Sequence, residues 1–267
     1  MGTFGDDVPS AIAAYYRALD RGDAEAAAAY FSNDVRYAVP WPGQIETAPR
    51  RLVVGRADLV GYFDARGAAA YRHEVTFCVV AGDNCLLEGV TRPLVGGRPD
   101  STFAATALLD ETGLVRRYVA YQCRPAVPLV DGECEPSVVV DARALVDCYF
   151  HALDAGDFDG AVDCFSDDVV YSHPPYRHTG IDSAEGRITF RGRAELLAGF
   201  NARGRRSFAH RILTCELRGS YGLFDGVVEG LPNGNVGGFL STMTLDGEGR
   251  IRRYLSFYCE PAACTGA

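Results

Sequence analysis

The five histidines of this chain are its best candidates for proton transfer near neutral pH, because an unperturbed imidazole has a pKa of about 6.5. His173 lies in the segment Ser-His-Pro-Pro-Tyr, between the end of a predicted strand and a rigid proline pair that would fix the ring. It is therefore a candidate general base. His173 and His178 could also be two metal ligands, but no cysteine or carboxylate pattern completes such a site, so no metal is expected.

The chain repeats its own sequence, which gives these candidates an internal control. Residues 15–37 match residues 149–171 at 12 of 23 positions, and residues 55–67 match residues 192–204 at 8 of 13. The offset of about 135 residues is far longer than the unit of a solenoid repeat. The repeat therefore predicts a duplicated domain, in which residues kept by both copies serve the fold and residues kept by one copy are candidates for chemistry.

The repeat and the length of 267 residues predict two domains. We expect a first domain over residues 1–125, a linker rich in proline and acidic residues over 126–140, and a second domain over 141–267. His73 and His210 occupy equivalent positions in the two copies, which favours a structural role for both.

Each copy begins with helical patterns and continues with strand patterns. In the first copy, Ile12, Tyr15, Tyr16 and Leu19 follow the i, i+3, i+4, i+7 spacing of an amphipathic helix, and Asp23 is a candidate N-cap of a second helix. A third helical pattern and a run of β-branched and aromatic segments follow. Helices followed by neighbouring strands predict an α+β fold with an antiparallel sheet.

The composition is that of an ordinary globular protein with an acidic surface. The net charge of −9 argues against nucleic-acid and anionic-membrane partners, which require clustered basic residues. No apolar run is long enough to span a membrane and no secretory signal is visible. The nine cysteines lack CxxC pairs and suit free thiols. We therefore expect a cytoplasmic protein with a small-molecule substrate as its partner.

The order of these motifs resembles a known superfamily. A helix, a Gly-Asp pair, a second helix, an Asp-Asp-Val-x-Tyr strand, a proline-rich loop, a Gly-Arg-x-x-Leu helix and four strands are similar to NTF2-like proteins, and above all to SnoaL-like polyketide cyclases and ketosteroid isomerases. The resemblance implies two tandem cone-shaped domains, each a curved antiparallel sheet with about three helices around a pocket. It also implies that the domains pair within one chain as a pseudo-dimer, the chain itself being a monomer or a homodimer.

The resemblance also implies roles for individual residues of the second copy. Ketosteroid isomerases carry a tyrosine seven residues before the Gly-Asp pair that donates a hydrogen bond to the developing oxyanion, and this position is Tyr149. The position of the family's general-base aspartate is His173, and that of a second oxyanion donor is Ser241. The position of an aromatic residue that lines the family's pocket is Tyr258. The first copy has Tyr15 in place of Tyr149, Val39 in place of His173, Ala105 in place of Ser241 and Gln122 in place of Tyr258. The second copy is therefore the expected active one, and the first pocket is expected to be degenerate.

These assignments predict a cofactor-independent acid–base enzyme: an isomerase, dehydratase or cyclase of secondary metabolism. Its substrate would be a small, apolar, oxygenated molecule such as a polyketide or terpenoid. The side chains expected to line the pocket are Leu153, Phe165, Tyr171, Phe200, Asp225, Val228, Tyr254 and Tyr258.

Two alternatives remain open. The protein could bind a small molecule or assemble with a partner without catalysis, in which case Tyr149 and His173 would be hydrogen-bonding groups for the ligand. It could also be an epoxide hydrolase or cyclase that uses Asp225 and Glu229, which alternate onto one face of a predicted strand, although a solvated strand face explains the same spacing. The acid–base enzyme predicted above requires the side chains of Tyr149 and His173 to converge on one enclosed cavity.

Overall fold

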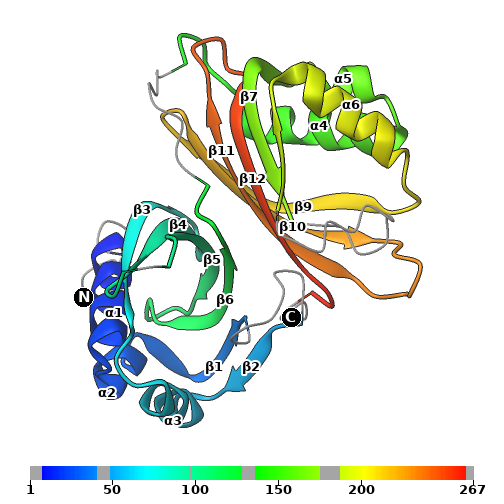
Figure 1. Ribbon diagram of the computed structural model, residues 1–267. Helices are drawn as coiled ribbons and strands as arrows, with labels where there is room; N and C mark the ends of the chain where they lie inside the picture. The colour runs from blue at the N-terminus through cyan, green and yellow to red at the C-terminus, as the bar shows by residue number, and fades with distance from the viewer. Residues whose placement is uncertain (1–7, 41–48, 97, 128–135, 175–186, 263–267) are drawn as a thin grey trace. The chain divides into compact units, whose positions relative to one another are not determined.

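The protein is described by a computed structural model that covers residues 8–40, 49–96, 98–127, 136–174 and 187–262. The chain divides into two compact units, and the division falls between Ala126 and Val127. Within the described ranges, each unit has three helices and one six-stranded sheet (Figure 1). The expected α+β fold of two tandem domains is confirmed. None of the described helices has the length and apolar character that a membrane span requires.

The two units have the same order of elements. The first contains α1 (Val8–Arg21), α2 (Ala24–Ala28), β1 (Phe31–Val39), β2 (Arg51–Val54), α3 (Arg56–Arg66), β3 (Tyr71–Ala81), β4 (Asn84–Pro93), β5 (Ser101–Leu109) and β6 (Val115–Cys123). The second contains α4 (Ala142–Ala155), α5 (Phe158–Val162), β7 (Phe165–His173), β8 (Ile188–Arg191), α6 (Arg193–Arg203), β9 (Ala209–Arg218), β10 (Tyr221–Glu229), β11 (Gly237–Leu245) and β12 (Ile251–Cys259).

Both sheets are mixed, which refines the expected antiparallel sheet. The strand orders are β2-β1-β6-β5-β4-β3 and β8-β7-β12-β11-β10-β9. All neighbouring strands run antiparallel except β1 with β6 and β7 with β12, which are parallel. The alternation of side chains predicts a strand but carries no information on the direction of its neighbour. The parallel pairs join the first strand of each unit to the last, so they close the fold around its interior.

The helices form where the apolar spacing and the caps predict them. Ile12, Tyr15, Tyr16 and Leu19 are all buried on α1. The Asp23 side chain accepts a hydrogen bond from the backbone N–H of Ala26, as an N-cap does. The second unit repeats both features: Val146, Tyr149, Phe150 and Leu153 are buried on α4, and the side chain of Asp157 accepts a bond from the N–H of Gly160.

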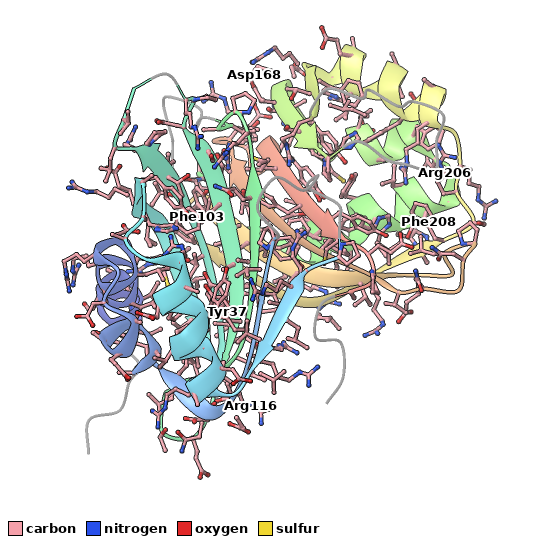
Figure 2. The ribbon with its side chains drawn as sticks, turned by 60° about the horizontal axis from the view of Figure 1, so that its bottom comes forward. Tyr37, Phe103, Arg116, Asp168, Arg206 and Phe208 are labelled. Carbon is pink, nitrogen blue, oxygen red and sulfur yellow. The ribbon has the colours of Figure 1, made fainter. Side chains whose placement is uncertain are left out.

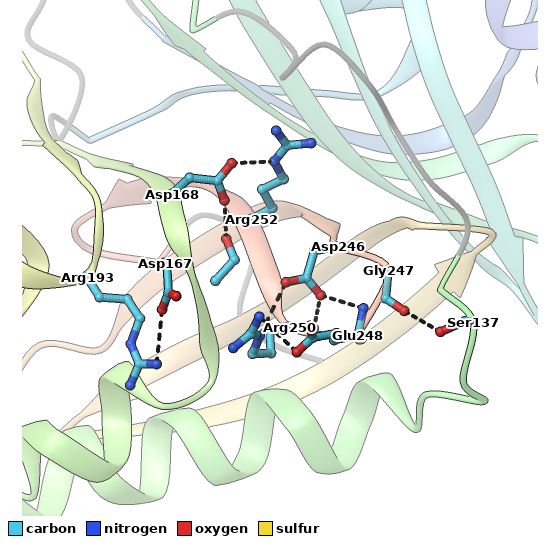
Figure 3. Close-up of polar contacts among 10 residues, drawn as sticks. Ser137, Asp167, Asp168, Arg193, Asp246, Gly247, Glu248, Arg250 and Arg252 are labelled. Atoms are coloured by element: carbon cyan, nitrogen blue, oxygen red, sulfur yellow. Dashed lines mark hydrogen bonds and ion pairs between the residues drawn. The ribbon is translucent and has the colours of Figure 1, made fainter.

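The turn between β11 and β12 has the sequence Asp-Gly-Glu-Gly and is held by the carboxylate of Asp246 (Figure 3). Asp246 Oδ1 accepts hydrogen bonds from the backbone N–H groups of Glu248 and Arg250, both at 2.9 Å. At the start of β12, Arg252 pairs with Asp168 of β7 at 2.9 Å. These bonds fix the entry into β12, the strand that makes the parallel pair.

One exposed ion pair has opposite polarity in the two units. In the first, Glu74 of β3 pairs with Arg92 of β4 at 2.7 Å. In the second, Arg211 of β9 pairs with Glu229 of β10, also at 2.7 Å. The two acidic and two basic residues stand at equivalent positions of the repeat, so the pairing has been kept while both charges have been exchanged. Each pair spans neighbouring antiparallel strands, where opposite charges stabilise the sheet.

A glycine in the middle of β4 allows an aromatic ring to approach the strand. A Cβ atom on Gly89 would lie 2.4 Å from both the Phe103 ring and the carbonyl oxygen of Glu74. Gly226 has the same relation to Phe239 and to the carbonyl oxygen of Arg211. The glycine and the ring are therefore features of the fold in both units.

We expect Gly89→Ala to destabilise the first unit by about 1–3 kcal/mol, because the added methyl group overpacks the strand. Gly61→Ala is the matched control, since a Cβ at this position of α3 meets nothing within 4 Å. It should stabilise the helix by about 0.5–1 kcal/mol. Denaturant unfolding of the two variants measures both effects, and equal stability of the variants would contradict this account.

Candidate active site in the second unit

Two stacked tyrosine rings form the centre of the second unit. Tyr171 on β7 and Tyr254 on β12 are register partners across the parallel strand pair, and their rings stack 4.5 Å apart at 3°. The hydroxyl of Tyr149, from α4, lies 2.8 Å from that of Tyr171. All three side chains are buried. The helix tyrosine therefore contacts the site through Tyr171.

The same arrangement occurs in the first unit, where Tyr37 and Phe103 mark the interior filled by side chains (Figure 2). Tyr37 stacks on Tyr118 at 4.9 Å and 7°, and the hydroxyls of Tyr15 and Tyr37 are 2.9 Å apart. The tyrosine triad is thus present in both copies, which indicates that it supports the fold whatever else it does.

The hydroxyl of the tyrosine on the last strand has its hydrogen-bond partner on a helix in the first unit and on a strand in the second. In the first unit, Tyr118 is bonded to the hydroxyl of Tyr16 from α1. The second unit has Phe150 at that helix position, and Ser241 of β11 donates to Tyr254 instead, at 3.2 Å. Ser241 also lies 3.1 Å from the hydroxyl of Ser256, and the first unit has Ala105 and Ala120 at these two positions. The predicted donor Ser241 therefore contacts Tyr254 directly.

His173 ends β7 on the same face as Tyr171 and is only 5% exposed. Its ring centre lies 5.7 Å from that of Tyr171 and 6.1 Å from that of Phe190. The Nδ1 atom is 2.6 Å from the carbonyl oxygen of Pro174. Because a carbonyl oxygen only accepts, Nδ1 carries the proton, and the Nε2 atom of the neutral ring carries the lone pair. The proline that follows His173 therefore fixes its tautomer, as the sequence suggested it would fix the ring.

Burial controls the protonation of His173. Desolvation lowers the pKa of the imidazole to about 3; the Pro174 carbonyl opposes this shift, and the positive charges of Arg187 and Arg203 add to it. The ring is therefore neutral at physiological pH and can accept a proton, although its conjugate acid is strong. His178 lies outside the described residues, so its relation to His173 is not described.

Most of the side chains expected to line the pocket belong to one buried cluster. Phe200 of α6 meets Tyr171 edge-on at 5.6 Å. Tyr258 packs against the cluster from β12, and its hydroxyl donates to Glu260 at 2.9 Å. The predicted wall residues in this cluster are Leu153, Phe165, Tyr171, Phe200, Val228 and Tyr254.

The carboxylates Asp225 and Glu229 do not face this interior, which corrects the expectation that they line the pocket. They do share one face of β10, but Phe224 and Val228 on the opposite face are the residues that join the aromatic cluster. Glu229 is exposed and paired with Arg211. Four residues along a strand also separate the two carboxylates by about 13 Å. The alternation predicted which residues share a face, but not which face meets the core.

Each unit contains a histidine–aspartate pair that the sequence analysis missed. The Asp20 carboxylate accepts from the backbone N–H of His73 at 2.8 Å and lies 2.6 Å from its Nδ1. Asp154 and His210 repeat both contacts at 2.8 Å. Each pair ties the first helix of a unit to the edge strand β3 or β9. Both aspartates stand in the repeated Ala-Leu-Asp sequence before the Gly-Asp pair, which is the signal that could have revealed them.

The comparisons with known proteins agree with this architecture. The SnoaL-like domain matches residues 12–118 and again residues 146–254, so the chain belongs to the SnoaL-like family and carries two copies of its domain. No protein of curated function matches the chain.

Solved structures similar to this chain resemble single halves of it. An NTF2-like protein of unknown function from Burkholderia xenovorans LB400 is 20% identical, over 47% of this chain and 88% of that one, with a TM-score of 0.35. SalBIII, an epoxide hydrolase/cyclase-like enzyme with a role in pyran ring formation in the polyether salinomycin, is 20% identical over 44% and 89%, with a TM-score of 0.35. A protein with a ketosteroid isomerase-like fold from Catenulispora acidiphila DSM 44928 is 19% identical over 42% and 85%, with a TM-score of 0.35.

The buried imidazole predicts a pH-dependent stability. The pKa of His173 is about 3 in the folded protein and about 6.5 in the unfolded chain, so the unfolded chain binds the proton more readily between these values. Stability should therefore fall as the pH drops through this window, by up to about 1.4 kcal/mol per pH unit. Denaturant unfolding between pH 7 and pH 5 should show a shallower loss for His173→Gln than for the wild type.

His151→Gln serves as the control for that measurement, because His151 is exposed on α4. Its loss of stability between the two pH values should equal that of the wild type. An unchanged slope in His173→Gln would show that His173 is not held neutral by burial.

The hydroxyl of the last-strand tyrosine is bonded by a helix residue in the first unit and by a strand residue in the second. This difference predicts that a helix hydroxyl can restore the stability lost when the strand hydroxyl is removed. Ser241→Ala should destabilise the second unit by about 1 kcal/mol, because Tyr254 loses a hydrogen-bond partner. Adding Phe150→Tyr should recover most of this loss, because it places a hydroxyl where the first unit has Tyr16. Unfolding of the single and double variants measures the coupling energy. Additive or worse destabilisation by the pair would contradict the equivalence.

Proposed function

We propose that the second unit is a cofactor-independent acid–base enzyme in which His173 takes a proton from a carbon atom next to a carbonyl group. The observation that carries this proposal is the buried, neutral imidazole, whose Nδ1 is 2.6 Å from the Pro174 carbonyl oxygen. The lone pair is thereby confined to Nε2. The first unit has Val39 at the equivalent position and offers no base there.

The low pKa of His173 is compatible with this role. A base with a pKa of about 3 is unprotonated at every physiological pH, and a carboxylate base with a pKa of about 4.6 performs the same reaction in ketosteroid isomerases. The negative charge that develops on a substrate next to the ring would stabilise the imidazolium and raise its basicity as the proton moves. Proton abstraction followed by return of the proton elsewhere gives isomerisation, and loss of a leaving group gives dehydration.

The tyrosine triad would supply the polar groups around the developing oxyanion. Tyr171 stands two residues before His173 on the same face of β7, and the centres of the two rings are 5.7 Å apart. Tyr149 acts through its bond to Tyr171, and Ser241 through its bond to Tyr254. Both are positioning residues in this proposal. The surrounding aromatic and aliphatic side chains favour a small, apolar, oxygenated substrate.

A binding function is the second candidate, and a specific observation favours it. The hydroxyl pair of the helix tyrosine and the β-strand tyrosine recurs in the first unit, which lacks the histidine. In a binding protein, His173 would accept a hydrogen bond from the ligand and no bond would break. The epoxide-opening alternative is not part of the proposal, because Asp225 and Glu229 do not face the aromatic interior.

A test of the proposal is exchange of α-protons for deuterium in a β,γ-unsaturated cyclic ketone, followed by NMR, together with the ultraviolet absorbance of the conjugated isomer. The wild type should catalyse exchange, and His173→Gln should lower the rate by at least about a hundredfold, the contribution of a general base. Activity should not decline between pH 7 and pH 5, because the pKa of His173 lies near 3.

Val39→Ala is the matched control in the first unit and should leave the exchange rate unchanged. Ligand-induced shifts without exchange in the wild type would favour the binding function. Wild-type exchange by a folded His173→Gln protein would refute His173 as the base.

A further inference from the structure

The structure also forms a pocket in the first unit, the copy expected to be degenerate. It lies where the N-terminal ends of β3 and β5 meet the C-terminal ends of β4 and β6, and its volume is about 260 Å³. Pockets for drug-sized ligands occupy about 300–1,000 Å³, so this one suits a smaller molecule. Two arginines, Arg98 and Arg124, and three hydroxyl groups, those of Tyr71, Thr91 and Ser101, stand in its wall.

From this pocket we infer that the first unit binds a small organic carboxylate. The inference concerns a different unit from the proposed base, so it holds or fails independently of the chemistry of His173. Its basis is the hydrogen-bonding state of the three hydroxyls, the charge of the lining, and the contrast with the same corner of the second unit.

The three hydroxyl groups are already acceptors of hydrogen bonds from the protein. Arg66 donates to the hydroxyl of Tyr71 at 3.0 Å, Gln122 donates to that of Thr91 at 3.4 Å, and Arg124 donates to that of Ser101 at 2.8 Å. A hydroxyl group that accepts keeps its own proton to donate. Among the described residues, none accepts from these hydroxyls. The wall therefore presents donors, and a ligand rich in acceptor oxygens complements it.

The charge of the wall points the same way. The chain carries a net charge of −9, yet the described residues that line this pocket include two arginines and no acidic residue. Among the described residues, Arg124 is bonded only through its Nε, to Ser101, and this bond holds the guanidinium group at the pocket. The remaining donors of a guanidinium group match the two oxygens of a carboxylate. Ala70, Pro93 and Val95 supply apolar surface for an organic body.

The corresponding corner of the second unit is built differently. Phe208 replaces Tyr71, and its side chain is labelled in Figure 2. The other substitutions at equivalent positions are Val228 for Thr91, Gly237 for Ser101 and Glu260 for Arg124. The three hydroxyl groups and the Arg124 guanidinium group of the first pocket are therefore absent from the second unit.

The second corner is also filled and satisfied internally. A Cβ on Gly237 would lie 2.3 Å from the Tyr258 hydroxyl oxygen, so this side chain occupies the space next to the strand. The carboxylate of Glu260 accepts from Tyr258 at 2.9 Å, from Asn235 at 3.1 Å and from Asn233. Anion binding is thus a property that separates the two copies, with the first copy as the binding one.

The test uses the full chain and fluorine NMR, with para-fluorobenzoate as the probe and para-fluorobenzamide as its uncharged analogue. At constant ionic strength the acid should bind saturably, and at least about tenfold more tightly than the amide, since hydrogen bonds to charged groups are the stronger ones. Arg124→Gln should weaken binding of the acid by about tenfold or more, and Arg124→Glu should abolish it. Inorganic phosphate should not displace the acid, because it has no apolar body.

Substitutions that introduce the second unit's own residues separate an effect on binding from an effect on folding. Tyr71→Phe and Thr91→Val introduce residues that the fold accepts at the equivalent positions, and each should weaken binding of the acid severalfold. Arg116→Gln is the matched control, because Arg116 is exposed near the start of β6, the strand that ends just before Arg124. It should leave the affinity for the acid unchanged. The inference would be overturned if the acid did not bind saturably, or if it bound no more tightly than the amide. Displacement of the acid by phosphate, or unchanged affinity in Arg124→Gln, would also overturn it.

Discussion

The parallel pairing of the first and last strands is the constraint on which the rest of each unit depends. In the second unit it places Tyr171 and Tyr254 side by side, so that their rings stack at 4.5 Å. The hydroxyl of Tyr149 then joins α4 to this pair. His173 lies two residues beyond Tyr171 on the same face of β7, so its ring stands beside this pair, 5.7 Å from that of Tyr171.

The two units satisfy the same buried hydroxyl by different means, and this difference shapes their interiors. A buried hydroxyl must have a partner, and the partner can come from the helix or from the sheet. The first unit uses the helix residue Tyr16, while the second uses the strand residue Ser241 and leaves an apolar ring on the helix. The second arrangement concentrates hydroxyls on the sheet side, on β11 and on β12, the strand next to β7.

The features predicted from the sequence are those with a local cause. The spacing of Tyr15 and Leu19 and the cap at Asp23 act within a few residues, so the helices could be placed before the structure was known. The repeat added the two-domain organisation. Strand direction could not be predicted, because the side chains of a parallel and an antiparallel strand alternate in the same way.

The parts of the site that escaped prediction depend on contacts distant in sequence. The aromatic cluster decides which face of β10 meets the core: Phe224 and Val228 join it, and Asp225 is left on the other face. The pocket of the first unit was not predicted because the copies were compared only at positions taken from the isomerase pattern. Tyr71 and Arg124 lie outside that pattern, although alignment of the two copies shows Phe208 in place of Tyr71 and Glu260 in place of Arg124.

The exchanged polarity of the exposed ion pair bears on how the two halves of the gene can evolve. A crossover that joined β3 of the first half to β10 of the second would set Glu74 beside Glu229, and the reciprocal product would set Arg211 beside Arg92. Like charges on neighbouring strands destabilise a sheet. Recombination between the halves therefore keeps this pairing only when it moves both strands of the hairpin together. For this ion pair, the hairpin and not the single strand is the segment that the two domains could exchange without loss.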